Sequence, residues 1–136
     1  MSRPESRVSV EELSPQTAPG VVYERYLREG ILAFQRCGGC RHAIFFPRVL
    51  CPACGGDDLT WEESAGLGTV YSTTVNHPRG ADAVNVSLVD LDEGFRVMTN
   101  VIEMPAADVH IGMRVRVQID TSAENPLPLF VKEGAL

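Results

Sequence analysis

The 136-residue sequence contains no long apolar run, and this absence limits the classes of protein that it fits. No segment approaches the roughly 18 consecutive apolar residues of a membrane-spanning helix. The first residues, Met1 to Arg7, also lack the apolar core of a secretory signal. Apolar residues make up 44% and charged residues 22% of the chain, as in globular proteins. We therefore expect a folded protein of the cytoplasm.

Positive charge is scarce. Twelve Lys and Arg stand against eighteen Asp and Glu, which gives a formal net charge of −6. Because nucleic-acid phosphates require a basic surface, this balance disfavours a nucleic-acid partner. Residues 67–136 contain only three aromatic residues, Tyr71, Phe95 and Phe130, too widely spaced for a stacking platform. A nucleic-acid-binding zinc-ribbon and OB module is therefore kept only as the alternative function.

Cysteine is absent outside two short motifs, Cys37-Gly-Gly-Cys40 and Cys51-Pro-Ala-Cys54. Ten residues separate the pairs, fewer than the roughly 15 to 20 of many such sites. Zn²⁺ prefers a tetrahedron of four thiolates, and each CxxC turn supplies two of them from one tight loop. The glycines after the second pair suit the positive φ that closes such a turn. We predict that Cys37, Cys40, Cys51 and Cys54 bind a structural Zn²⁺ in a zinc ribbon, because four protein ligands leave no open position.

Other uses of these cysteines fit the sequence less well. A redox CxxC belongs at the start of a helix in a βαβ unit, and the sequence shows no such unit. Two disulfides require an oxidising compartment. His42 follows the first pair directly, and we expect it to be an exposed neighbour of a shell that four thiolates already complete. Iron suits the same four sulfurs, so the choice between zinc and iron stays open.

The N-terminal half is expected to contain one helix and the ribbon. Residues 1–20 are polar and rich in proline, which is typical of a flexible tail. Val21–Glu29 has apolar residues at helical spacing and is followed by a glycine stop, and residues 31–36 form a strand that enters the first motif. Residues 62–68 are a polar connector containing glycine. Trp61, just before it, is expected to pack between the ribbon and the next domain.

The C-terminal half is expected to be a small barrel. Its predicted strands lie at residues 69–75, 83–91, 95–102, 115–119 and 127–132. In the second of these, Val84, Val86 and Leu88 share one face. Five short strands favour an OB-fold, since a sandwich needs about seven. The predicted fold class is thus mainly β, with a tail (1–20), a helix plus zinc ribbon (21–62) and a five-stranded OB-fold (63–136).

Two groups of polar residues are candidate functional sites. The arginines around the ribbon either form a solvated, ion-paired surface or bind an anion. The carboxylates of the acid–base candidates lie at a predicted hairpin turn, where Asp and Glu serve turn formation without catalysis, and no motif joins them to a histidine. The arginines are Arg25, Arg28, Arg36, Arg41 and Arg48, and the acid–base candidates are Asp90, Asp92, Glu93, His77 and His110.

The order of these parts is similar to that of a known family. The segments EGILAFQRCGGC, PRVLCPACGG, GLGTVYSTTVNH, VSLVDLDEGFRVMTNV, HIGMRVRVQI and LPLFVKEG together resemble the DUF35 family, from about Tyr23 to Lys132. The sequence departs from it at Phe46-Pro47, where relatives often carry two prolines. Members join a rubredoxin-like zinc ribbon to an OB-fold, so the resemblance implies the same four cysteine ligands.

The resemblance also implies a function. Family members are typically non-catalytic accessory or scaffold partners of thiolase-like acyl-CoA enzymes, and sometimes of hydratases, in lipid metabolism. The chain is therefore expected to be no enzyme itself and to form a hetero-oligomer with such an enzyme. Acyl-CoA would give the arginines a role, because CoA phosphates suit guanidinium groups. The resemblance does not assign CoA contacts to particular arginines.

Overall fold

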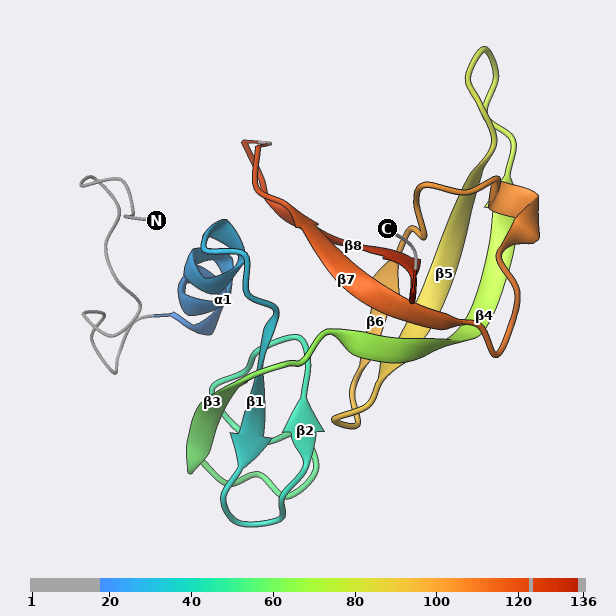
Figure 1. The fold of residues 1–136 in the computed structure, drawn as a ribbon. Coiled ribbons are helices and arrows are strands. Elements are labelled where there is room, and N and C mark those ends of the chain that lie inside the picture. The colour runs from blue at the N-terminus through green and yellow to red at the C-terminus, as the bar shows by residue number, and fades with distance from the viewer. Residues whose placement is uncertain (1–17, 123, 135–136) are drawn as a thin grey trace.

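One helix precedes two β-sheets in the computed structural model, which describes residues 18–122 and 124–134 (Figure 1). Helix α1 spans Pro19–Arg28, so it begins two residues before the predicted start. Proline suits the first turn of a helix, where its missing N–H has no partner to bond. The prediction of a flexible tail falls mainly on residues 1–17, outside the described residues. No helix in the described part of the chain is long and apolar enough to cross a membrane.

The first sheet is the ribbon, with three antiparallel strands in the order β2-β1-β3. They are β1 (Ala33–Cys37), β2 (Ala43–Ile44) and β3 (Leu59–Glu63). The predicted connector began at residue 62, but β3 continues to Glu63, which pairs with Ala33. Pairing along the whole of β1 thus shortens the connector to residues 64–66.

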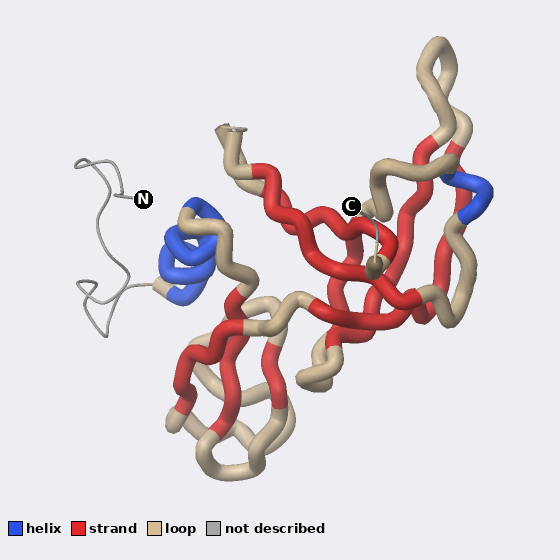
Figure 2. The backbone as a smooth tube through the Cα atoms, in the orientation of Figure 1, coloured by secondary structure: helices blue, strands red, loops and turns tan. Residues whose placement is uncertain are grey.

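The second sheet is the predicted five-stranded barrel, with strand order β6-β5-β4-β7-β8. Its elements are β4 (Leu67–Asn76), β5 (Val84–Leu91), β6 (Arg96–Thr99), the 3₁₀ turn η2 (Ala106–Asp108), β7 (Arg114–Asp120) and β8 (Leu127–Lys132). The chain after β6 meets β8, because Ile102 N donates to Phe130 O at 2.7 Å and Phe130 N to Asn100 O at 3.2 Å. These bonds curl the sheet toward closure, as Figure 2 shows, and the mainly β fold class is confirmed.

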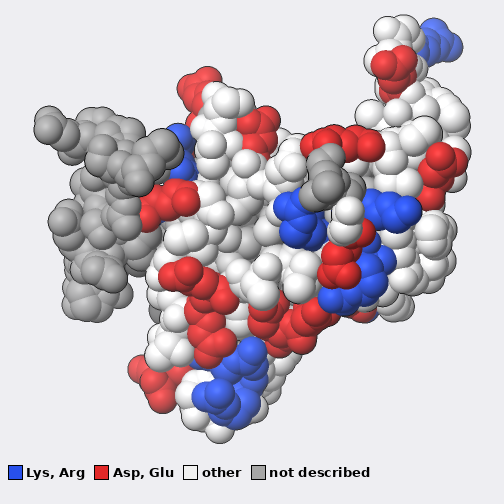
Figure 3. Space-filling model, in the orientation of Figure 1, with Lys and Arg blue, Asp and Glu red and all other residues white. Residues whose placement is uncertain are grey.

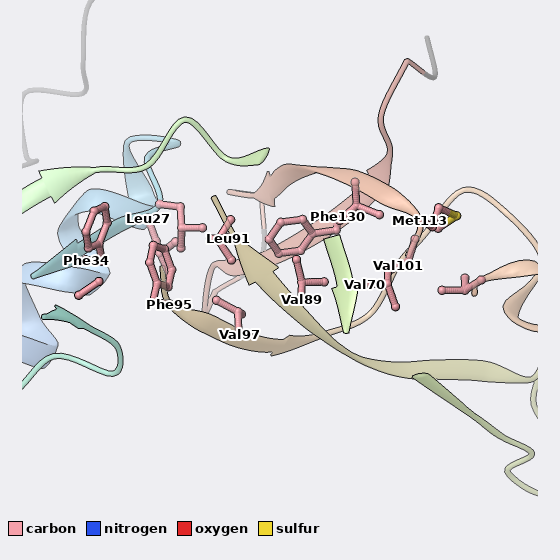
Figure 4. Close-up of a cluster of buried hydrophobic side chains, with 14 residues drawn as sticks. Leu27, Phe34, Val70, Val89, Leu91, Phe95, Val97, Val101, Met113 and Phe130 are labelled. Carbon is pink, nitrogen blue, oxygen red and sulfur yellow. The ribbon is translucent and has the colours of Figure 1, made fainter. Parts of the chain in front are cut away.

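One apolar core runs through the helix, the ribbon and the barrel. Leu27 of α1 and Phe34 of β1 belong to the same buried cluster as Val89 and Phe130 of the barrel. Phe34 stacks on Phe95 with ring centroids 4.7 Å apart (Figure 4). The ribbon and the barrel share this core. That a domain boundary lies between residues 62 and 63 therefore stays a prediction.

Glu93, in the turn between β5 and β6, holds the short connector in place. Its carboxylate accepts hydrogen bonds from Ser64 Oγ and from the backbone N–H of Ala65, both at 2.8 Å. Its carbonyl oxygen accepts a bond from Arg36 of β1 at 3.3 Å. This acid–base candidate therefore links the barrel to the ribbon.

Trp61 does not have the position expected from the sequence. Its ring lies 5.6 Å from that of Tyr26, so it packs on α1, and the prediction that it packs between ribbon and barrel is wrong. Phe34, Phe45 and Phe95 take that place, since their rings follow one another with centroids 4.7 Å and 5.3 Å apart. Successive side chains of a strand point to opposite faces, and that of Trp61 lies on the face of β3 that meets α1. Its position near a domain boundary did not indicate which face this would be.

Candidate metal centre

The two CxxC motifs fold into knuckles with the same backbone hydrogen bonds. The residue after the second cysteine donates back to the carbonyl of the first, from Arg41 to Cys37 at 2.9 Å and from Gly55 to Cys51 at 2.8 Å. Both donors have positive φ, +68° for Arg41 and +79° for Gly55. The sequence predicted this conformation for the glycine but not for the arginine, because L residues with a Cβ rarely adopt it.

The knuckles bring all four sulfurs together. They lie within 4.8 Å of one another, and two pairs, Cys37 with Cys54 and Cys40 with Cys51, are 3.6 Å apart. A zinc ion with Zn–S bonds of about 2.3 Å requires sulfurs about 3.8 Å apart at the corners of a tetrahedron. A disulfide requires about 2.05 Å. The spacing therefore fits a single metal ion held from four sides.

Backbone N–H groups point at these sulfurs and stabilise negative charge on them. Gly39 and Cys40 donate to Cys37 Sγ at 3.3 and 3.5 Å, and Ala53 donates to Cys51 Sγ at 3.4 Å. The Cys40 N–H contributes most, and with its neighbours it outweighs desolvation and lowers the pKa of Cys37 to about 7. A metal requires thiolates, so these donors prepare Cys37 for it. At Cys54 the Gly56 N–H also lowers the pKa, but the neighbouring Cys37 and Cys40 side chains outweigh it and raise the pKa to about 12.

Burial differs between the two cysteines of each knuckle. Cys37 and Cys51 are buried, with Ile44 and Leu59 packed around them, whereas Cys40 and Cys54 are exposed. The first cysteine of each pair thus anchors the knuckle to the ribbon, and the second closes it at the surface.

Gln35 fixes the loop between the knuckles, and sequence reasoning missed it. Its side-chain amide is buried, donates to Arg48 O at 3.0 Å and accepts from Arg48 N at 2.7 Å. In the loop that contains Arg48, the side chains of Phe46, Val49 and Leu50 are 67%, 71% and 52% exposed. We call residues 46–50 the inter-knuckle loop. The available signal was an amide side chain directly after the apolar run of residues 31–34.

The five candidate arginines have different surroundings. Arg28 pairs with Glu24 at 2.6 Å, and Arg36 pairs with Glu62 at 3.2 Å. Arg25 lies in the last turn of α1, where a cation interacts favourably with the negative end of the helix dipole. Arg41 and Arg48 are exposed on the ribbon. In Figure 3, Lys and Arg gather at the free end of the ribbon and again on the barrel, with acidic residues beside each group.

The other acid–base candidates also have structural partners. Asp90 accepts from Arg96 at 2.6 and 3.2 Å, and Asp92 accepts from Arg114 at 2.8 Å through both oxygens. The hydrogen bonds from Arg114, together with its charge, lower the pKa of Asp92. An ionised, ion-paired carboxylate is a poor proton carrier near neutral pH.

The histidines lie apart from the cysteine cluster. His42, His77 and His110 are exposed, and His110 Nδ1 lies 3.2 Å from the carbonyl oxygen of Asp108. Across residues 18–122 and 124–134, the four cysteines are the one group of three or more His, Cys, Asp or Glu whose ligand atoms meet.

Comparison with known proteins agrees with this arrangement. Residues 26–60 match the family described as ChsH2, rubredoxin-like zinc ribbon domain, and residues 61–120 match ChsH2, C-terminal OB-fold domain. The chain is 30% identical over 100 residues to a "DUF35 domain-containing scaffold protein" of Methanocaldococcus jannaschii, covering 69% of this chain and 68% of that one. It is 36% identical over 104 residues to a "Probable enoyl-CoA hydratase alpha subunit" of Thermomonospora curvata, covering 73% of this chain. The match spans only 33% of that longer subunit.

Two solved structures have the same fold. A chain of the "Ltp2-ChsH2(DUF35) aldolase" superposes with a TM-score of 0.73 at 30% identity, over 88% of this chain and 98% of that one. A DUF35 protein of unknown function from Sulfolobus solfataricus superposes with a TM-score of 0.66 at 14% identity, over 91% of this chain and 92% of that one, and shows the fold alone. The zinc ribbon, the OB-fold and the four adjacent sulfurs occur together and in the expected order, and the chain belongs to the DUF35 family.

Proposed function

We propose that this chain is a non-catalytic accessory subunit that binds a thiolase-like or hydratase enzyme acting on acyl-CoA. One observation carries the proposal: the chain matches 98% of the length of a DUF35 chain whose structure is named as part of an Ltp2–ChsH2 aldolase. The names of the curated relatives, a hydratase subunit and a scaffold protein, support the same class of role.

The inter-knuckle loop is the proposed contact on the ribbon. Phe46, Val49 and Leu50 are more than half exposed, and contiguous exposed apolar side chains mark interaction sites. The two hydrogen bonds between Gln35 and Arg48 hold the backbone of this loop. A loop that is already ordered loses little conformational entropy on binding, which favours affinity.

Zinc has a structural role in this proposal. Cys37, Cys40, Cys51 and Cys54 are its proposed ligands, and both ends of the inter-knuckle loop connect to them. A structural zinc site contributes folding free energy directly, so the metal would keep the loop in its binding conformation.

Acyl-CoA contact is the finer part of the proposal. Arg41, directly after the first knuckle, and Arg48, within the inter-knuckle loop, are exposed and suit the phosphates of a CoA that is shared with the partner enzyme. Arg25, Arg28 and Arg36 complete the candidate set, although ion pairs to Glu24 and Glu62 already engage two of them. The first pair is therefore expected to contribute most.

The accessory role is tested by co-purification from the native host. The tagged protein should retain a thiolase-like or hydratase enzyme in constant stoichiometry, identified by mass spectrometry and confirmed by reconstitution from purified subunits. Purification alone, or with nucleic acid, would contradict the role, and the second result would favour the alternative function.

CoA contact is tested by calorimetry on the reconstituted complex. Arg48→Gln should weaken CoA binding, whereas Arg79→Gln, an equally charge-reducing change in the exposed β4–β5 loop, should leave it unchanged. Equal CoA affinities for the two variants would show that Arg48 does not bind CoA, and the accessory role would still stand.

A further inference from the structure

In the first half of strand β5 the polar residues lie inside the barrel and the apolar residues outside, whereas Val89 and Leu91 further along the strand are buried. Asn85 and Ser87 are buried, with exposures of 3% and 1%. Val84 and Val86, on the other face, are 43% and 37% exposed. An antiparallel sheet that faces water on one side normally has the opposite pattern. The outer face therefore needs an explanation that the fold alone does not supply.

Hydrogen bonds determine which face of β5 is inside. The Asn85 side chain donates to Val101 O at 2.6 Å and accepts from Val101 N at 2.9 Å, and Ser87 donates to Asn85 Oδ1 at 2.8 Å. A slip of one residue would leave these buried backbone groups unpaired, which costs several hydrogen bonds. The outward position of the valines is thus a fixed property of this strand.

Strand β6 extends the outer apolar surface, whereas on β4 the polar residues Ser72, Thr74 and Asn76 pair with the apolar residues of β5. Leu88 follows Val86 on the same face, and Met98 of β6 pairs directly with it. Met98 is 72% exposed, and Tyr71 of β4 is 51% exposed. We call the surface formed by Tyr71, Val84, Val86, Leu88 and Met98 the outer face. Val84 and Val86 pair with Asn76 and Thr74, at the end of the two strands next to the β4–β5 loop, and this loop projects beyond the barrel in Figure 1.

The charges at the edge of the outer face neutralise each other. Arg96 binds both oxygens of Asp90, and its guanidinium carbon lies 3.6 Å from the centre of the Tyr71 ring. A guanidinium already engaged by a carboxylate and a ring has little to offer a phosphate. The surface is complementary to an uncharged apolar partner and a poor match for nucleic acid or CoA phosphates.

We propose that the outer face docks against an uncharged, apolar protein surface of the partner acyl-CoA enzyme. Strands β5 and β6 are the second and third strands of the barrel, and OB-folds generally use this face to hold their ligands. In this chain the face is largely apolar and its charges are paired, which favours a protein surface as its ligand. The inference rests on the proposed function and adds a second contact, on the barrel, to the one proposed on the ribbon.

Charge placed on the outer face tests this contact. With the purified enzyme identified by co-purification, Met98→Glu and Val86→Glu should each weaken binding by on the order of tenfold or more, because a carboxylate would be buried without a partner. Ile111→Glu is the matched control, since Ile111 is 68% exposed in the turn before β7, outside the outer face. Zinc content and the thermal midpoint should be the same in all three variants, which separates lost contact from lost folding.

Methionine oxidation supplies a second readout on the unmodified protein. Met98 should be oxidised readily by hydroxyl radicals in the free protein and protected in the complex, with half-buried Met104 as the internal reference. Binding by Met98→Glu with wild-type affinity, or unchanged oxidation of Met98 in the complex, would overturn the outer-face contact and leave the accessory role standing. Dimers of the free protein that Met98→Glu dissociates would also overturn it. Failure of the wild type to bind any acyl-CoA enzyme would overturn the proposed function itself.

Discussion

The ribbon and the barrel are both antiparallel β-sheets but are stabilised in different ways. The ribbon has a small cluster of its own, in which Cys37 and Cys51 are two of the three buried residues. The barrel is built around a much larger apolar cluster that contains Val89, Val115 and Phe130, each fully buried. A segment as short as the ribbon cannot bury enough apolar surface to fold alone, so bound metal takes over the role of a core.

Removing a zinc ligand should have the largest effect, and this effect should fall on the ribbon and not on the barrel. Cys51→Ser is expected to abolish metal binding and unfold the ribbon, because structural zinc contributes on the order of 10–16 kcal/mol in small zinc domains. Metal analysis and hydrogen exchange of residues 33–63 would measure both effects. His42→Ala is the control beside the knuckle and should retain one zinc per chain. Metal retained in Cys51→Ser would contradict the ligand assignment.

Truncating a buried side chain of the barrel should destabilise the barrel but leave the zinc site of the ribbon intact. Phe130→Ala is expected to lower the free energy of unfolding by about 3–5 kcal/mol, as for large buried aromatic residues. Urea unfolding would measure the loss, and the zinc content of the folded variant should remain at one per chain. Loss of zinc at urea concentrations where the variant is still folded would show that the ribbon depends on the barrel more than its own ligands imply.

The contact between the two regions is tested at Glu93. Glu93→Gln weakens the bonds to Ser64 and Ala65 and is expected to cost about 1–2 kcal/mol, since hydrogen bonds to a charged group exceed neutral ones. Faster amide exchange at Ala65 and Gly66 would report a loosened connector. Glu63→Gln, an exposed change at the end of β3, should alter neither quantity.

The smallest expected effect concerns the acid stability of the barrel. Arg114 holds the pKa of Asp92 below its ordinary value, so the pair stabilises the folded state above that value and stops doing so as pH falls through the lowered pKa. Asp92→Asn should therefore be slightly less stable than wild type near neutral pH, and the difference should be smaller at about pH 3, below the ordinary pKa of aspartate. Urea unfolding at both pH values compares the two proteins, and zinc release in acid affects them equally. A difference that stays the same size in acid would mean that Asp92 acts through packing.

The sequence was sufficient to predict the features that depend on local chemistry. Cysteine spacing predicted the knuckles, and the four sulfurs do meet. Turn residues and β-branched runs predicted the five barrel strands to within a few residues. These features follow from ligand preference, backbone φ and strand propensity, which act over a few residues.

Features that depend on distant partners were not predictable in the same way. Val84, Val86 and Leu88 share a face as expected, but that strand also has apolar Val89 and Leu91 on the opposite face, and either face could be buried. The backbone of Val101, sixteen residues from Asn85, determines which one is inside. The side of β3 that Trp61 occupies likewise depends on where α1 lies.

The paired knuckles have a consequence for how such a protein changes over time. Their non-cysteine residues differ at every position, Gly-Gly against Pro-Ala between the sulfurs and Arg-His against Gly-Gly after them, yet the backbone bonds are the same. The cysteines and the main chain therefore carry the architecture, and the intervening side chains differ without changing it, although at Gly38 an added Cβ would run into the Asp58 side chain. Lineages of this family could exchange these side chains to suit new enzymes while the fold stays unaltered.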